Sequence, residues 1–303
     1  MIDTLPISTA NKLTSTRTWL QQLLPVYALR CCMRFSQDAY PGFYHQGALT
    51  AWVRTVMGSQ SDFSDYMSID VLEQNKARFK AGDLYRFTVY GIGAKGKAYL
   101  AGLPRAIISF QTRWDAAMPF RDNWSLQGIE HFCDGEILEQ TEIPLALETQ
   151  KLHDEMISWR DKGSIKIHFF SPWRVLRNKA SRQTNKGEDR YCRNSDDLKE
   201  NNLWLTRIDD SLRKLAEDHG AIIGERKLLL PVNVIVSLAW VNAAYKNGLG
   251  KSQPMGGLIG DIDILDPSQL SEDDLALLVA GQYLGVGQRR VFGNGRYRLS
   301  CDD

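Results

Sequence analysis

Residues 275–299 read LALLVAGQYLGVGQRRVFGNGRYRL, and they hold the clearest pattern in the chain. Two G-x-G pairs stand five residues apart, and their glycines are Gly285, Gly287, Gly293 and Gly295. Arg289 and Arg290 lie between the pairs, Arg296 follows them, and residues 281–300 contain no carboxylate. Glycine allows a backbone to approach a ligand closely, and arginine offers planar, permanently charged forks that fit phosphate. The segment therefore predicts a loop that binds a polyanion, with RNA as the first candidate.

Length and composition set wider limits. The 303 residues suffice for two ordinary domains, and 43% hydrophobic with 24% charged residues is typical of globular proteins. The sequence has no apolar run of about 18 residues and no signal-peptide pattern at its start, so no membrane contact is expected. The five cysteines lack CxxC spacing, which predicts free thiols, no metal site and a cytoplasmic location.

Charge is distributed unevenly although the net charge is only +1. Residues 76–113 carry eight basic side chains and one acidic, and residues 174–193 carry seven basic and two acidic. Residues 114–164 carry eleven acidic and four basic. This favours one basic and one acidic face, although solvated surfaces that are uneven by chance would give the same counts.

Hydrophobic periodicity predicts the same order of elements twice. In the first half, a strand, a helix, two strands, a helix and a strand are expected at 27–36, 45–57, 66–75, 84–91, 93–103 and 105–111. In the second half, the same series is expected at 165–170, 205–219, 227–241, 258–264, 273–283 and 296–300. The predicted fold class is α+β, with two tandem ferredoxin-like (βαββαβ) domains at 1–162 and 163–303. Residues 174–201 are expected to form a long basic loop.

The segments GGLIGDIDIL and LGVGQRRVFGNGRY, with a helix between them, resemble the C-terminal signature of the CRISPR-associated RNA-processing endoribonucleases (the sixth Cas protein, in the RAMP superfamily). HFFSPWRVLR at 168–177 resembles the family's entry strand into its second domain, and FYHQGALTAWVRTVMG at 43–58 its first helix. The similarity runs from about residue 27 to the end. It implies two ferredoxin-like domains, binding of CRISPR repeat RNA, and cleavage of the precursor transcript without metal or cofactor. The products would carry a 2′,3′-cyclic phosphate and a 5′-hydroxyl.

Attack by a ribose 2′-OH needs a base, an acid and positive charge at the phosphate. His45 is the candidate for base or acid, because imidazole titrates near neutral pH and the family places its histidine near this first helix. Tyr40 and Tyr44 flank it and are candidates for orienting the ribose. Family members often use a lysine here, but residues 13–75 contain none, so Arg54 is the candidate charge donor. A helix-capping histidine and ordinary aromatic packing are the alternatives for the first three.

The residues expected to contact RNA fall into two groups. The loop group comprises Gly285, Gly287, Arg289, Arg290, Gly293, Gly295 and Arg296. The second group is a basic strip of Arg174, Arg177, Lys179 and Arg182. Few aromatic residues accompany the strip, so backbone contact is expected there, not base reading. A solvated loop is the alternative for the arginines.

Two other functions compete with RNA cleavage. A non-catalytic RAMP subunit would bind guide RNA with other Cas proteins of an effector complex, on the same fold. A dinucleotide-dependent enzyme would explain the glycines, but Gly285 and Gly287 follow a helix and lack the third glycine of GxGxxG.

Overall fold

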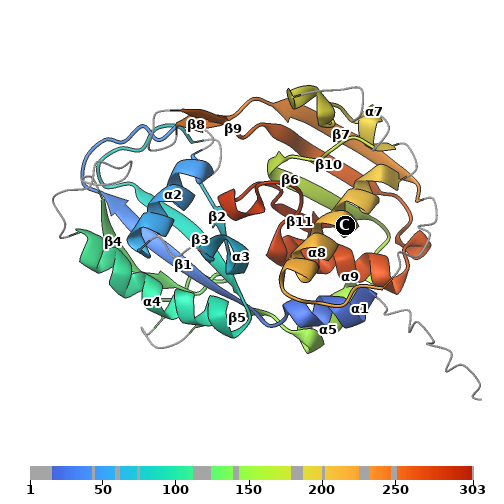
Figure 1. Ribbon diagram of the computed structural model, residues 1–303, viewed down its shortest axis with the longest axis horizontal. Helices are drawn as coiled ribbons and strands as arrows, with labels where there is room; N and C mark the ends of the chain where they lie inside the picture. Colours follow the sequence, from blue (N-terminus) through green and yellow to red (C-terminus); the bar gives the residue numbers. More distant parts are fainter. Residues whose placement is uncertain are drawn as a thin grey trace, which may run out of the picture.

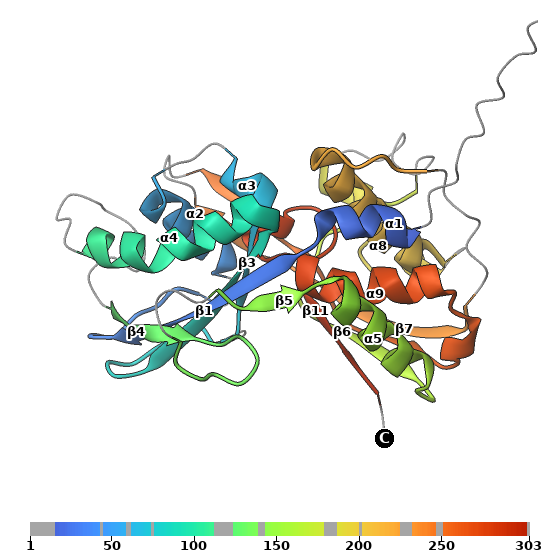
Figure 2. The same cartoon turned by 90° about the horizontal axis from the view of Figure 1, so that it is seen from below.

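The chain forms two antiparallel β-sheets that lie side by side, each with helices packed on one face (Figures 1 and 2). The computed structural model describes residues 16–42, 45–58, 62–73, 76–111, 124–138, 143–178, 187–199, 202–224, 232–246 and 251–301. Among the described helices, none combines the length and the apolar composition that a bilayer span requires.

The first sheet contains β1 to β5, in the order β2-β3-β1-β4 with β5 also paired to β1. Its elements are β1 (Val26–Phe35), α2 (Gln46–Val56), α3 (Phe63–Tyr66), β2 (Met67–Val71), β3 (Leu84–Ile92), α4 (Gly93–Gln111), β4 (Trp124–Glu130) and β5 (Leu145–Leu147). The long strand β1 pairs antiparallel with β3 on one side and with β4 on the other. Apolar side chains of α2 and α4 meet this sheet around Trp52, whose ring lies 4.9 Å from that of Trp124.

The second sheet has the order β11-β6-β10-β7. Its elements are β6 (Ile165–Trp173), α8 (Leu203–Asp218), β7 (Val234–Val241), β10 (Gly257–Ile264), α9 (Glu272–Leu284), the 3₁₀ turn η5 (Arg290–Phe292) and β11 (Tyr297–Ser300). In both sheets the fourth strand of the βαββαβ series lies beside the first, and the first beside the third. The predicted α+β architecture with two tandem ferredoxin-like units is therefore confirmed. A separate hairpin, β8 (Ala244–Lys246) with β9 (Ser252–Pro254), extends from the second sheet toward α2 (Figure 1).

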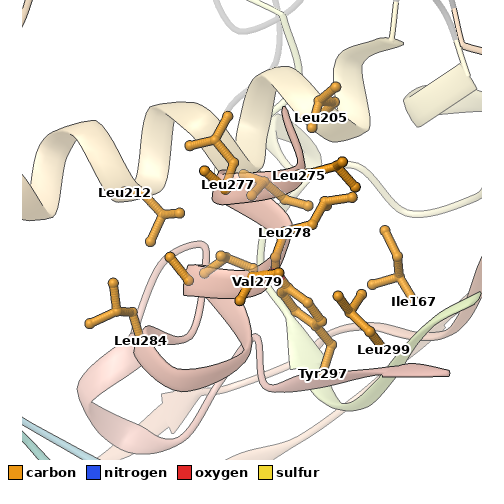
Figure 3. Packing of buried hydrophobic residues seen from close by; sticks show 14 of the residues in the cluster. Ile167, Leu205, Leu212, Leu275, Leu277, Leu278, Val279, Leu284, Tyr297 and Leu299 are labelled. Carbon is orange, nitrogen blue, oxygen red and sulfur yellow. The ribbon is translucent and has the colours of Figure 1, made fainter. Parts of the chain in front are cut away.

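The helix α9 is the centre of the second core. It begins with a capping box, in which the side chains of Ser271 and Asp274 each bind the other's backbone N–H. Its apolar side chains pack against α8 and the second sheet, as Figure 3 shows for Leu278 and Leu212. Two helices of the N-terminal half, α1 (Thr16–Leu20) and α5 (Thr149–Arg160), also pack on α9. Because this core draws on both halves, the division at residue 162 remains a proposal.

Two predicted breaks are wrong, and both fall at proline. The helix α4 runs on through Pro104, so the strand expected at 105–111 is helical. The buried Leu100, Leu103 and Ile107 keep helical spacing across the proline, and their burial outweighs its missing N–H. Similarly, β6 continues through Pro172 instead of stopping there. The expected loop at 174–201 includes a 3₁₀ turn η2 (Gly187–Arg190) and the short helix α7 (Asp196–Lys199).

Candidate nucleic-acid interface

The glycine loop follows α9 and lies between the two sheets. All four of its glycines have positive φ, between 70° and 83°. A Cβ at Gly295 would lie 1.7 Å from the carbonyl oxygen of Val286, so only glycine closes this turn. A Cβ at Gly293 would lie 2.8 Å from the carbonyl oxygen of Ile69 in β2. Close packing of the backbone therefore requires these two glycines, both within the loop and between the loop and the first sheet. The close approach of a ligand does not require them.

The loop also contacts the first turns of α2. The hydroxyl of Thr50 donates a hydrogen bond of 3.3 Å to the carbonyl oxygen of Val291. The side chain of Gln46 lies 3.4 Å from the position of a Cβ at Gly293. The loop arginines and the candidate histidine of the first half therefore belong to segments that touch.

His45 is the N-cap residue of α2, just before the helical turn in which it was expected. Its Nδ1 lies 2.8 Å from the carbonyl oxygen of Gly42, and its ring centroid lies 5.4 Å from that of Tyr85 and 6.3 Å from that of Phe79. Since a carbonyl oxygen only accepts, Nδ1 carries the proton and Nε2 the basic lone pair. The side chain is 2% exposed, and this burial lowers its pKa, so the imidazole is neutral at pH 7.

The other catalytic candidates have different surroundings. Tyr40 is 68% exposed, and the guanidinium of Arg78 lies 5.6 Å from its ring centroid. Tyr44 lies outside the described residues. Arg54 is in the last turn of α2, nine residues after His45, which corresponds to roughly 13 Å along a helix. Arg54 therefore does not stand beside the imidazole.

Arg289 and Arg290 keep their charges available. Arg289 has a φ of 62°, and its Nη1 lies 3.2 Å from the sulfur of Met255. Arg290 donates a 3.2 Å hydrogen bond to the carbonyl oxygen of Leu284. Burial and the nearby charge of Arg296 lower the pKa of Arg290 to about 10, so it is still cationic at pH 7. No carboxylate of the described residues lies within ion-pair distance of Arg289 or Arg290.

Arg296, by contrast, is a buried connector between the two sheets. Its side chain has no exposed surface, and its guanidinium lies 4.3 Å from the ring centroid of Tyr90 in β3. It donates to the carbonyl oxygen of Tyr283 at 2.7 Å and to the hydroxyl of Ser68 in β2. The expectation that Arg296 contacts RNA is corrected accordingly, because all of these donors face protein.

The basic strip is only partly available. Arg174 is 2% exposed; its guanidinium lies 3.9 Å from the ring centroid of Tyr191, and Nη1 donates 3.0 Å to the carbonyl oxygen of Gly256. Arg177 forms an ion pair with Asp197 and donates to two backbone carbonyl oxygens. Phosphate contact by Arg177 is therefore not supported. The remaining members, Lys179 and Arg182, lie outside the described residues.

A cavity of about 470 Å³ lies between α3, α8, the glycine loop and the segment after β6, and we call it the α8 cavity. Its cationic lining residues are Arg174, Arg207, Lys214, Arg289 and Arg290. Sequence analysis did not select Arg207 and Lys214. A signal was present, because the two residues stand seven apart on one helix and so share a face.

In the described part of the chain, His, Cys, Asp and Glu side chains form no cluster of three or more that could hold a metal ion.

Among known proteins, similarity to this chain is found in solved structures and not in sequences. Neither a protein-family model nor a curated protein sequence matches the chain. Among solved structures, a partial Cas6-RT-Cas1–Cas2 complex superposes with a TM-score of 0.71 at 23% identity, covering 93% of this chain and 47% of the other. The chain has the fold of Cas6 proteins. A Cas6 product complex of the Thermus thermophilus protein has a TM-score of 0.52 at 14% identity, covering 91% of this chain and 99% of that one.

A third similar structure is a Cas6-related protein from Pyrococcus furiosus, with a TM-score of 0.51 at 12% identity and coverage of 92% and 100%. The two single Cas6 proteins are thus matched along nearly their whole length. In contrast, the chain spans about half of the longer protein in the Cas6-RT-Cas1–Cas2 complex. The three matches cover 91% to 93% of this chain.

Proposed function

We propose that this chain is a metal-independent endoribonuclease that binds CRISPR repeat RNA and cleaves the precursor transcript into guide RNAs. The observation that carries the proposal is the contact between the arginine-bearing glycine loop and the first turns of α2, which His45 caps. The shared fold with Cas6 structures, including a product complex, supports it.

The chemistry divides between the two segments. The lone pair on Nε2 of His45 would accept the proton of a ribose 2′-OH, and the lowered pKa keeps that lone pair available at pH 7. Arg290 would stabilise the charge that builds on the attacked phosphate, and Arg289 would bind another phosphate of the same RNA. Tyr40, which is exposed, and Tyr44, which lies outside the described residues, stay candidates for orienting the ribose, and Arg54 is a more distant cation. The imidazole is buried, so RNA binding must uncover His45 for attack to occur.

A second function deserves a test because of this burial. With His45 only 2% exposed, the fold would also serve a non-catalytic subunit that binds guide RNA in an effector complex. In both cases we propose repeat or guide RNA as the main partner, other Cas proteins as further partners, and the cytoplasm as the place of action.

The decisive experiment incubates the purified chain with labelled repeat RNA from the host's CRISPR array in EDTA. We expect one cut that leaves a 2′,3′-cyclic phosphate, and His45→Ala to slow it by about 100-fold or more. The matched control is His153→Ala on the exposed face of α5. Tight binding by the wild type without cleavage would support the subunit instead, and absence of binding would exclude both functions.

A further inference from the structure

The α8 cavity is lined by the glycine loop together with Ser64 of α3 and Ser211 of α8. The backbone N–H of Gly287 donates a 2.7 Å hydrogen bond to the Ser211 hydroxyl. This bond fixes the loop against α8. The cavity is therefore bounded by regular elements of both sheets' helical layers and by a loop held in place.

The charge of the cavity is positive. Five cationic side chains and two carboxylates line it, a surplus of three positive charges. Arg207 is neutralised by Asp210 at 2.6 Å, and Lys214 is paired with Asp218. Arg289 has no such carboxylate among the described residues. An anion in the cavity would thus meet the loop arginines first and could recruit Lys214, whose side chain is 67% exposed and only loosely held.

The walls between these charges are aliphatic. Val175, Leu176, Leu215 and Val291 contribute to the lining. An inorganic phosphate would make no apolar contact with these aliphatic side chains. The backbone of a double helix binds at a protein surface and does not enter a cavity of this size. A ligand with a flat apolar part and an attached anion fits both features, and about 470 Å³ is within the usual size for a small-molecule site.

We propose that the α8 cavity takes one unpaired nucleotide, with the base between the aliphatic walls and the phosphate at Arg289 and Lys214. This rests on the proposed function, since the nucleotide is taken to come from the RNA that the loop contacts. Proteins read RNA largely through bases that leave the stack, which gives such a cavity a clear use. A free nucleoside monophosphate offers the same chemistry and is the other possible source.

The test compares Lys214→Ala with Lys199→Ala. Both lysines are exposed and pair with an aspartate about one helical turn away, but Lys199 lies on α7, outside the cavity. On repeat RNA with single-stranded flanks, we expect Lys214→Ala to weaken binding about tenfold and to reduce the slope of log K against log salt by about 1. Lys199→Ala should change neither, and both variants should keep the wild-type melting temperature. Equal effects of the two substitutions would overturn the proposal.

The base is tested separately, by replacing the unpaired nucleotides of the RNA one at a time with abasic residues. One of these replacements should weaken binding, and Leu176→Ala, which trims a cavity wall, should have no further effect on that RNA. If every abasic RNA binds as the intact one does, no base enters the cavity and the proposal fails.

Titration with uridine and adenosine 5′-monophosphate, followed by calorimetry, separates this proposal from the function on which it rests. If the wild type binds no repeat RNA, the proposed function fails, whereas saturable monophosphate binding that Lys214→Ala removes would keep the cavity as a site for free nucleotides. If neither RNA nor monophosphate binds, both ideas are overturned.

Discussion

Two pairs of arginines stand within ten residues of the C-terminal segment, and their surroundings are opposite. Arg289 and Arg290 make no ion pair with a described carboxylate and line a cavity. Arg296 is fully buried, and Arg298 binds Asp70 of the first sheet at 2.9 Å. The residue type is the same in both pairs, so position in the fold decides whether an arginine meets a ligand or joins two sheets. The contrast predicts that the loop pair affects binding and the strand pair affects stability.

The largest stability effect is expected from Arg296→Ala. Truncation leaves the carbonyl oxygen of Tyr283 and the hydroxyl of Ser68 without their donor and opens space over the Tyr90 ring. We expect a loss of about 3 kcal/mol in the free energy of unfolding, measured by urea denaturation.

Arg296→Lys is the matched variant, and it should restore little of that loss, because an ammonium cannot reproduce the stacked, planar fork. A stable Arg296→Ala protein that has lost RNA affinity would reverse the division between the two pairs.

The loop pair should behave in the opposite way. Replacing Arg289 and Arg290 together by alanine removes two cations that no described carboxylate neutralises. We expect repeat RNA to bind about 100-fold more weakly at low salt, with the slope of log K against log salt reduced by about 2. The melting temperature should stay within about 2 °C of the wild type, since few contacts of the core are lost. Binding that is unchanged, or lost only together with folding, would show that these arginines are structural too.

A smaller effect is expected at the edge of the interface between the sheets. Asp70 is 2% exposed, whereas the Arg298 side chain is 48% exposed, so solvent screens their ion pair on one side. A double-mutant cycle of Arg298→Ala and Asp70→Asn should give a coupling energy of about 1 kcal/mol. The readout is urea denaturation of all four proteins at two salt concentrations. A coupling near zero would mean that the pair of Arg298 and Asp70 does not help to hold β11 against β2.

The sequence was sufficient for the architecture. Alternating and helical periodicities predicted the order of elements in both βαββαβ series, but the fourth strand of the first series is β4 and not residues 105–111. It was misleading at Pro104 and Pro172, because local rules for proline do not include the burial that neighbouring elements provide. The spacing of apolar residues is a local property of the sequence, and it sets which face of each helix or strand is buried in the fold.

The site was less predictable from sequence for a physical reason. Nothing near Arg296 indicates that Ser68 and Tyr90, more than 200 residues earlier, surround its guanidinium. His45, at the start of α2, likewise has Tyr85 of the strand β3 as its neighbour. Tertiary contacts between distant residues determine which polar side chains bind other protein groups. A single sequence does not show which distant residues are in contact. The two G-x-G pairs and the arginines between them could be selected from the sequence because their signal is local.

The smallest expected effect concerns His45 and extends the same contrast to the catalytic candidate. Burial lowers the pKa of His45 in the folded protein, whereas the unfolded chain has the ordinary value of about 6.5. The folded state therefore binds fewer protons, and the contribution of His45 reduces stability as the pH falls below about 6.5, with no effect above it. Urea denaturation at pH 7.5 and 5.5 should show a smaller acid loss for His45→Gln than for the wild type. Equal losses would mean that the imidazole is not buried in solution.

The same imidazole separates catalysis from simple binding when RNA is added. If RNA binding uncovers His45, its ring leaves Phe79 and Tyr85 and comes close to a phosphate, and both changes favour the imidazolium form. An NMR titration of the His45 ring proton should then give a higher pKa with a 2′-deoxy, uncleavable repeat RNA than without it, and the exposed His153 supplies the reference signal. A pKa that stays low in the complex would place the histidine with Arg296 among the internal residues, and the chain would then bind RNA without cutting it.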